Sequence, residues 1–374
     1  MKVLLLSAYA AYSHVQWQNA LQTMFPKWQW RILTLPPRYF SWRVRGNALY
    51  WSMAERETLE SHYDLLIATS MTDLATLRGL VPALSAVPTV LYFHENQFAY
   101  PQASGQNSLV EAQMTSIYSA LAADRIVFNS HYNHDSFMAG CEALLHKLPD
   151  YVPPAVGSVL RERASVLAVP FDNSSVQAVA PRWPPARRKA SGRPLRLLWV
   201  GRFEHDKGGD GLLRILQQLE TRKLEYELAV TGQQFRQSPP VFDEIRDSFA
   251  ERLVHFGFLE NPLHYQALLQ ASDVVLSTAQ HEFQGLAVME AVAHGCIPVV
   301  PRRLVYPEIY PAQCCYDSCP HNPEREAGSA AALIIKAAEN RVASNAAQIA
   351  VAAYGMRALA PRYHHLFRCT AAPG

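Results

Sequence analysis

Short, uninterrupted apolar runs separated by segments of helical length are the feature that most restricts how this chain folds. Runs of Val, Leu and Ile bounded by polar turns are typical of strands buried on both faces of a parallel sheet. In the first half of the chain these runs cover residues 3–6, 31–35, 64–68, 89–93 and 125–128. In the second half they cover residues 195–200, 225–230, 253–256, 273–277 and 297–300. Their alternation with helical segments predicts an α/β chain of two Rossmann-like, doubly wound domains.

Length and composition agree with two domains. The chain has 374 residues, 49% of them hydrophobic, which is enough to build two buried cores. We expect an N-terminal domain at residues 1–170 and a C-terminal domain at 195–351, facing a central cleft. The last segment, residues 352–374, is expected to be helical and to pack back on the N-terminal domain.

A basic, proline-rich linker is predicted at residues 171–194. Apolar runs are few there, and no acidic residue occurs between Asp172 and Glu204. Six cations lie together in this stretch and just beyond it, namely Arg182, Arg187, Arg188, Lys189, Arg193 and Arg196. They indicate either a solvated linker or a contact with the phosphate backbone of a large anionic acceptor.

Charge and hydropathy exclude several classes of protein. A net charge of +2 excludes a globally basic nucleic-acid binder but allows a local basic patch. The first apolar run is too short for a signal peptide, and no run reaches the ~18 residues of a membrane span. We therefore expect a cytoplasmic chain with no membrane partner and six reduced cysteines. The Cys314-Cys315-x3-Cys319 cluster lacks a second nearby pair, so no metal site is expected.

The segment from His281 to Glu290 indicates an anion site. It follows the apolar run at 273–277, and Gly285-Leu286 can open a helix whose free N–H groups point at a bound anion. Glu282 and Glu290 stand eight positions apart, which places them on nearly one helix face. The alternative is a solvated helix face. With the preceding strand and glycine, the pattern favours a pocket for a nucleotide diphosphate, with Glu290 on a ribose diol.

Cations follow the first apolar run of the C-terminal domain. Ligands of open α/β sheets bind at the carboxyl ends of the strands. Arg202 and Lys207 stand there in the segment from Gly201 to Gly209, and an Arg fork with a Lys charge suits a diphosphate. Gly232 ends the next run, at a turn expected to contact the base or the ribose. The alternative for the cations is an exposed charged turn.

Polar residues also follow strands of the N-terminal domain. His94, Glu95, Asn96 and Gln97 come directly after the run at 89–93, where they are expected to handle a proton or read acceptor hydroxyls. Three further residues that follow strands are expected to face the same cleft, namely Ser13, His14 and Asn129.

Cations and aromatic residues alternate from Trp42 to Trp51, in a segment without a clear strand or helix period. An aromatic ring can stack on a base and an arginine can hold a phosphate, so Arg43 and Arg45 are candidates for acceptor binding. The alternative is a loop whose tryptophans pack on the domain core.

These motifs together resemble a known family. Glu282-x7-Glu290 and Gly201-Arg202-x4-Lys207 resemble retaining glycosyltransferases of the GT-B fold. The segments at 42–45, 92–97, 202–207, 281–283 and 304–309 resemble, more narrowly, the glycosyltransferase-like-domain-containing family, which includes tRNA-queuosine α-mannosyltransferases. The resemblance spans about residues 1–310.

The resemblance implies a retaining transfer of mannose from GDP-mannose to the cyclopentenediol of queuosine, at the wobble position of tRNA-Asp. Residues 1–170 would bind this tRNA, and residues 195–351 would bind the nucleotide sugar. No cofactor or metal is implied, and no Asp-x-Asp motif is present. In such enzymes the leaving phosphate takes the acceptor proton, so no general base is assigned.

Carried onto single positions, the resemblance implies catalytic roles for His94, Arg202, Lys207 and Glu282. It implies donor contacts by Gly201, Arg202, Lys207, Gly232, Glu282, Phe283, Gln284, Gly285, Leu286 and Glu290. It implies acceptor contacts by Ser13, His14, Arg43, Arg45, His94, Glu95, Asn96, Gln97 and Asn129. Two positions depart from the pattern, because Ala10-Ala11 replaces a Gly-Gly loop and Phe283 directly follows the first glutamate.

Three other functions remain open from the sequence. The chain could be a GT-B glycosyltransferase that uses another sugar nucleotide and a lipid or saccharide acceptor, although no basic amphipathic membrane stretch is present. It could be a sugar-nucleotide epimerase, which needs no acceptor. It could also be a silent RNA-binding protein, which would not need Arg202, Lys207 and Glu282. The oligomeric state is not determined.

Overall fold

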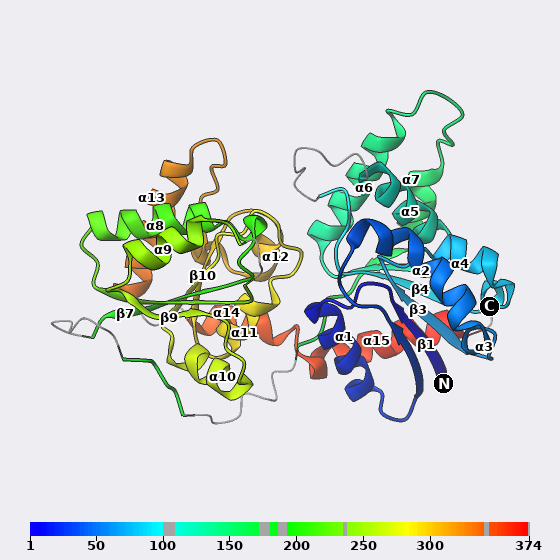
Figure 1. Cartoon of the computed structure of the whole chain (residues 1–374), viewed down its shortest axis with the longest axis horizontal. Helices are drawn as coiled ribbons and strands as arrows, with labels where there is room; N and C mark the ends of the chain where they lie inside the picture. Colours follow the sequence, from blue (N-terminus) through cyan, green and yellow to red (C-terminus); the bar gives the residue numbers. More distant parts are fainter. Residues whose placement is uncertain (100–108, 172–179, 186–192, 235–237, 340–343, 373–374) are drawn as a thin grey trace. The chain divides into compact units, whose positions relative to one another are not determined.

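The computed structural model describes residues 1–99, 109–171, 180–185, 193–234, 238–339 and 344–372. The chain divides into two compact units. Unit 1 comprises Met1–Phe171 and Met356–Gly374, and unit 2 comprises Asp172–Gly355. Each unit holds one parallel sheet with helices packed on its faces, as Figure 1 shows. This architecture confirms the predicted α/β class.

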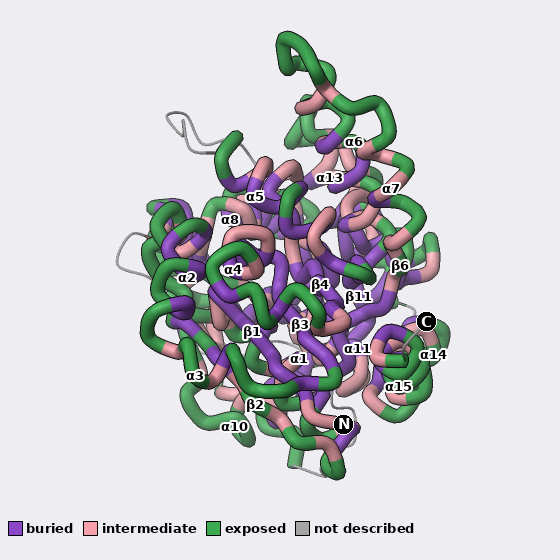
Figure 2. Tube along the Cα trace, turned by 90° about the vertical axis from the view of Figure 1, so that its right-hand side faces the viewer, coloured by how far each residue is buried: buried purple, intermediate pink, exposed green. Residues whose placement is uncertain are grey.

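Unit 1 is built on a six-stranded sheet in the order β2-β1-β3-β4-β5-β6. Every strand pair in it is parallel. Its strands are β1 (Lys2–Ser7), β2 (Gln29–Thr34), β3 (Leu65–Thr69), β4 (Thr89–Phe93), β5 (Arg125–Phe128) and β6 (Ala164–Val166). Strands β3 and β4 are buried along their whole length, as expected for a sheet covered on both faces (Figure 2).

Unit 2 repeats this design in the order β12-β11-β10-β7-β8-β9, again with parallel pairs. Its strands are β7 (Leu195–Val200), β8 (Tyr226–Thr231), β9 (Leu253–Gly257), β10 (Val274–Leu276), β11 (Ile297–Pro301) and β12 (Cys315–Tyr316). All ten apolar runs therefore form strands. The sequence did not predict β6 and β12, because three and two residues are too few to show an apolar run.

Helices cover both sheets. In unit 1 they are α1 (Tyr12–Met24), α2 (Phe40–Ala54), α3 (Arg56–Leu59), α4 (Leu74–Leu80), η1 (Pro82–Ala86), α5 (Leu109–Leu121), α6 (His131–Leu145), α7 (Val156–Arg163) and α15 (Met356–Ala371). In unit 2 they are η2 (His205–Lys207), α8 (Gly209–Thr221), α9 (Val241–Ser248), α10 (Pro262–Ala271), α11 (Leu286–Ala293), α12 (Tyr306–Ile309), η3 (Ala312–Cys314), α13 (Pro323–Glu339) and α14 (Ser344–Ala352).

The C-terminal helix α15 lies beside α1 and the central strands of unit 1, although it ends the chain (Figure 1). Its Tyr363 is fully buried. The phenol oxygen accepts a hydrogen bond from the indole of Trp17 at 2.9 Å and donates to the carbonyl of Ala168, also at 2.9 Å. Buried polar groups need such partners, so these bonds tie the last helix into unit 1.

The aromatic segment from Trp42 to Trp51 lies in helix α2, so the alternative of a loop is wrong, although Trp51 does pack on the core. Val44, Ala48 and Trp51 form its buried stripe at spacings of four and three. The opposite face carries exposed apolar residues, among them Trp42, Leu49, Tyr50 and Met53. With apolar residues on both faces, the sequence loses the contrast that reveals an amphipathic helix.

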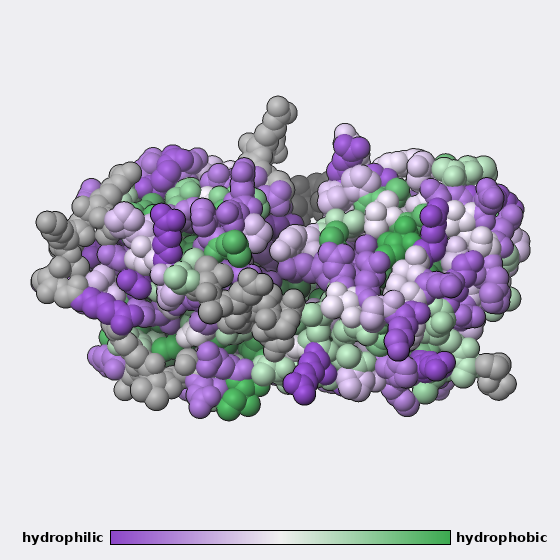
Figure 3. Space-filling view, turned by 90° about the horizontal axis from the view of Figure 1, so that it is seen from below, coloured by the Kyte–Doolittle hydropathy of each residue, from purple (hydrophilic) through white to green (hydrophobic). Residues whose placement is uncertain are grey.

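The two sheets each have one point where the strand order reverses. In unit 2 it lies between β7 and β10, and in unit 1 between β1 and β3. The loops after these strands meet at the carboxyl edge, which is where open α/β sheets bind ligands. Among the described residues, no helix is long and apolar enough to cross a membrane. The face drawn in Figure 3 shows hydrophobic residues only in separate groups among hydrophilic ones.

Candidate active site

The strongest cluster of candidate residues lies at the reversal point of unit 2. One loop follows β7 and carries Arg202 and Lys207, and the other follows β10 and carries Glu282. The backbone carbonyl of Asp206 accepts from the N–H groups of Gln280 and His281 at 2.8 and 3.2 Å. These bonds join the two loops directly, so the motifs separated in sequence share one edge of the sheet.

Lys207 and Glu282 form an ion pair at this edge. The Nζ of Lys207 lies 3.2 Å from Oε2 of Glu282 and 3.0 Å from Oδ2 of Asp206. It also donates to the carbonyl of His281 at 3.0 Å. An ammonium has three donors, so all three of them have protein acceptors here. A diphosphate that reaches Lys207 must therefore replace one of these acceptors.

The charge state of the pair follows from its surroundings. Burial alone would raise the pKa of Glu282, but the charge and hydrogen bond of Lys207 and the Gly285 N–H hold that pKa below its usual value. Burial would lower the pKa of Lys207, but Glu282 and Asp206 raise it above its usual value. Both groups are therefore charged at neutral pH.

Two glycines set the backbone around the pair. Gly208 and Gly285 immediately precede α8 and α11, with φ of 74° and 71°, a left-handed region that favours glycine. A Cβ on Gly208 would lie 2.0 Å from the carbonyl oxygen of Thr278, and one on Gly285 would lie 3.1 Å from the ring of Tyr306. Both helices thus begin at the ligand edge, and the N-cap residue of α11, Gly285, has no side chain with which to cap the helix. Leu286 is the first residue of α11.

The other predicted donor residues line the same edge at different depths. Arg202 is half-exposed and pairs with Glu204 at 2.9 Å, so it is more accessible than Lys207. Glu290 lies on α11, where the hydroxyl of Tyr265 donates to it at 3.4 Å. Phe283 and Gln284 are buried beneath the loop.

Gly201 and Gly232 end adjacent strands. A Cβ on Gly232 would lie 1.7 Å from the carbonyl oxygen of Gly201, so only glycine fits at this crossing. Gly201 in turn donates its N–H to the carbonyl of Thr231 at 3.1 Å. In the structure, these two glycines allow the loops that follow β7 and β8 to lie close together. This role does not depend on whether either glycine also contacts a donor.

Sequence reasoning missed Arg303, which positions the loop that carries Glu282. Its guanidinium donates twice to the carbonyl of Ala279, at 3.1 and 3.0 Å. It also forks onto Glu326 at 2.8 and 2.9 Å. No local motif surrounds Arg303, so only its place after β11, at the ligand edge, could have indicated it.

Asp206 and Tyr306 were also missed, although both lie in segments that carry the resemblance. Asp206 stands next to Lys207 in sequence. The hydroxyl of Tyr306 lies 2.6 Å from Oγ of Ser277, and its ring packs where a side chain on Gly285 would project. Adjacency to Lys207 was the available signal for Asp206.

In unit 1, His94 lies at the end of β4 inside an aromatic box. Its ring stacks on His14 at a centroid distance of 4.0 Å and meets the edge of Trp17 at 4.9 Å. Burial and the neighbouring His14 hold the pKa of His94 well below its usual value, so the ring is neutral at neutral pH. Neither ring nitrogen has a hydrogen-bond partner within the described part of the chain. The Nε2 of His14 lies 3.4 Å from Glu95.

The amides near His94 are used by the fold. Asn96 donates to Asn133 and Ser136 and accepts from the N–H groups of Phe98 and Ala99. Asn129 donates to the carbonyl of His94 at 2.9 Å and accepts from Asn133. Acceptor contacts by Asn96 and Asn129 stay predictions, and a direct contact would replace one of these bonds.

Gln97 is buried, with its amide 3.8 Å from the sulfur of Met71. Ser13 is half-buried in the first turn of α1. The contacts of these two side chains therefore differ from the aromatic contacts that surround His94. Their proposed contact with an acceptor remains a prediction.

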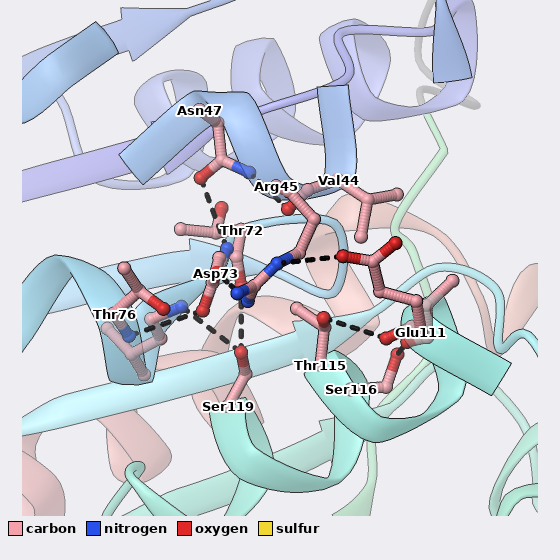
Figure 4. A network of polar contacts seen from close by, with 12 residues as sticks. Val44, Arg45, Asn47, Thr72, Asp73, Thr76, Glu111, Thr115, Ser116 and Ser119 are labelled. Atoms are coloured by element: carbon pink, nitrogen blue, oxygen red, sulfur yellow. Dashed lines mark hydrogen bonds and ion pairs between the residues drawn. The ribbon is translucent and has the colours of Figure 1, made fainter. Parts of the chain in front are cut away.

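Arg45 belongs to a polar network on α2 (Figure 4). Its guanidinium lies 2.5 Å from Asp73 and 3.2 Å from Glu111. Asn47 on the same helix donates to the carbonyl of Met71 and accepts from the N–H of Asp73. The charge of Arg45 is therefore balanced within the protein. Arg43 has no acidic partner among the described residues.

The predicted linker is described only in part. Arg187, Arg188 and Lys189 lie outside the described residues. Arg193 pairs with Asp273 at 3.0 Å, and the guanidinium of Arg196 lies 5.6 Å from the ring of Trp183. Within the described ranges, no group of three or more His, Cys, Asp or Glu side chains is arranged to hold a metal ion.

Comparison with known proteins identifies the family. Residues 2–171 match the family model described as tRNA-queuosine alpha-mannosyltransferase N-terminal. The tRNA-queuosine alpha-mannosyltransferase of Drosophila melanogaster is 32% identical over 318 residues, covering 84% of this chain and 83% of its own length. The chain belongs to the tRNA-queuosine α-mannosyltransferase family. It is therefore a glycosyltransferase, as the motifs predicted.

A second family model and several solved structures also resemble this chain. Residues 141–303 match the model for a family 4 glycosyltransferase in conflict systems. The crystal structure of Anabaena HepE with UDP is 15% identical with a TM-score of 0.69, covering 99% of this chain and 100% of that one. Sucrose-phosphate synthase of Thermosynechococcus elongatus is 15% identical with a TM-score of 0.71, covering 99% and 98%. These structures confirm the predicted GT-B fold.

Proposed function

We propose that this glycosyltransferase moves mannose from GDP-mannose to the cyclopentenediol of queuosine, at the wobble position of tRNA-Asp, with retention of configuration. The family membership supports a queuosine-bearing tRNA as acceptor. The observation that carries the chemistry is the Lys207–Glu282 pair at the reversal point of unit 2, beside the start of α11. Cations and the N–H groups at the start of α11 suit a sugar diphosphate.

The proposed roles follow from accessibility and charge. Arg202 meets the diphosphate first, because it is half-exposed, and Lys207 exchanges a carboxylate for a phosphate oxygen. Their positive charge stabilises the leaving GDP without a bound metal. Glu282 contacts sugar hydroxyls and Glu290 the ribose diol. For the neutral ring of His94 we propose a hydrogen bond to a hydroxyl of the transferred mannose.

The proposed reaction needs no protein nucleophile. The bond between the anomeric carbon and the phosphate oxygen breaks, and a bond to the queuosine hydroxyl forms on the same face. The proton of that hydroxyl passes to the departing phosphate oxygen. The protein orients the two substrates, excludes water and balances the charge of GDP. Because its acceptor is a tRNA, we propose that the enzyme works in the cytoplasm.

The test combines purified protein, GDP-mannose and tRNA from cells that make queuosine, with queuosine-deficient tRNA as the control. The tRNA is digested to nucleosides, and mass spectrometry looks for queuosine that has gained one hexose. We expect hexosylated queuosine only with the competent tRNA, and in the presence of EDTA as well. Transfer to lipid or saccharide extracts instead would overturn the acceptor. Conversion of GDP-mannose to an epimer without tRNA would overturn the reaction class.

A further inference from the structure

Trp42 is an exposed aromatic ring that the protein holds in place. It lies in the first turn of α2 and is 58% exposed. Its indole lies over Gly46, one turn along the helix. A Cβ at Gly46 would come within 2.5 to 2.8 Å of three ring atoms. Glycine is disfavoured inside a helix. At this position, however, the missing Cβ leaves room for the ring to lie flat against the helix with its other face open to solvent.

The helix under this ring is anchored at the ligand edge of unit 1. Asn47 bonds to Met71 and Asp73, and both belong to the loop that follows β3. Arg45 adds the ion pair with Asp73 that Figure 4 shows. Strand β3 borders the reversal point of the sheet, so α2 presents Trp42 from a rigid support beside the expected acceptor site.

The neighbourhood of Trp42 is cationic. Arg43 is half-buried, and its Nε has no hydrogen-bond partner among the described residues. The exposed Arg38 lies over the ring of Tyr39, which is 71% exposed, at 5.7 Å. The first turn of α2 holds no acidic residue. Trp42, Arg43 and Gly46 lie in the first two turns of α2, and Tyr39 immediately precedes the helix with φ of 55°.

We propose that this surface, made of Arg38, Tyr39, Trp42 and Arg43, binds unpaired nucleotides of the acceptor RNA. One base stacks on the open face of Trp42, and Arg43 pairs with a phosphate of the same strand. Flat rings beside unpaired cations are the features with which proteins hold single-stranded nucleic acid. The inference rests on the proposed function, because it takes the loop that carries the modified base as its ligand.

Charge favours RNA over a protein partner on this surface. The two cations have no acidic partner in the part of the chain that the structure describes, and they flank the two rings. The purely apolar part of the exposed face, at Leu49 and Met53, lies further along α2. A protein interface would be expected to centre on those residues rather than on Trp42.

The test measures binding of the full chain to labelled tRNA and to its isolated anticodon stem-loop by fluorescence anisotropy across a range of salt. Trp42→Ala should raise the Kd about tenfold and leave the salt slope unchanged. Arg43→Gln should reduce the slope of log Kd against log salt by about 0.7, the value for one phosphate of a single strand. Met53→Ala, on the same helix and 69% exposed, is the matched control and should bind as wild type.

Gly46→Ala separates ring placement from folding. The methyl group displaces Trp42 without removing it, while alanine favours the helix. We expect RNA affinity to fall as in Trp42→Ala with a Tm that is unchanged or higher. GDP-mannose affinity should be unchanged in both variants, because unit 2 holds the proposed donor site.

Each other outcome overturns the inference. If the wild type transfers mannose but Trp42→Ala and Gly46→Ala both bind tRNA normally, the surface is wrong and the proposed function stands. If the wild type neither binds nor modifies tRNA, the inference and the proposed function both fail. If Trp42→Ala alters the oligomeric state and leaves RNA affinity intact, the surface is an interface between copies of the chain.

Discussion

The ammonium group of Lys207 lies 3.2 Å from the carboxylate of Glu282, although 75 positions separate the two residues. The strand order of unit 2 creates this contact. Strands β7 and β10 are neighbours in the sheet, so the loops that follow them end at the same edge. Two motifs that are separate in sequence thereby become one charged cluster at the ligand edge of unit 2.

Lys207→Ala should lower kcat/KM for transfer by about 10²–10³-fold, because a cation at the leaving phosphate would be lost. Affinity for tRNA should change little, since Lys207 is assigned to the donor. Transfer kinetics and tRNA binding measure the two effects. Arg214→Ala, which removes an exposed pair with Glu324 in the same unit, is the control. A parallel loss of tRNA affinity in Lys207→Ala would place this lysine on the RNA instead.

Glu282→Gln should change how stability depends on pH. The pKa of Glu282 is held below its usual 4.5 in the folded protein. Its charge therefore stabilises the fold above about pH 4.5, and this contribution is lost as the pH falls through the lower folded value. The difference in unfolding free energy between wild type and Glu282→Gln should shrink with acidification, as measured by urea unfolding. Glu324→Gln controls for removal of an exposed charge, and a difference independent of pH would contradict the pairing with Lys207.

Gly285→Ala should destabilise unit 2 by about 1–2 kcal/mol, because alanine is strained at a positive φ. The added methyl group also presses on Tyr306, so transfer activity should fall with stability. Gly79→Ala is the matched control: it lies in α4 with nothing within 4 Å of an added Cβ. That variant should gain up to about 1 kcal/mol. Thermal unfolding of both proteins checks the prediction, which fails if they shift alike.

Arg303→Lys should reduce kcat by about 10- to 100-fold, since lysine cannot keep the fork between Ala279 and Glu326. Affinity for GDP should be nearly unchanged, because Arg303 acts through the loop and does not touch the nucleotide. Arg302→Lys, a half-exposed neighbour 3.5 Å from Asp317, serves as the control. Equal losses of kcat and GDP affinity would mean that Arg303 contacts the donor itself.

Much of the fold was predictable because each buried parallel strand is a continuous apolar run in the sequence. Each of the ten apolar runs became a strand, since a strand covered on both faces must be apolar along its length. Helix α2 has no clear amphipathic pattern in the sequence, because Trp42 and Met53 make its outer face as apolar as its inner one. Strands β6 and β12 were too short to be recognised.

The sequence by itself determined the α/β class, the ten main strands and the motifs that contain Arg202, Lys207, Glu282 and His94. These features depend on the order of neighbouring residues, which a chain carries in any conformation. Only the tertiary structure decided that Lys207 meets Glu282, that Arg303 braces their loop, and that Arg45 is neutralised while Arg43 is not. Such contacts join residues far apart in the chain. They therefore form only when the strands take their order in the sheets and bring the loops that follow them side by side.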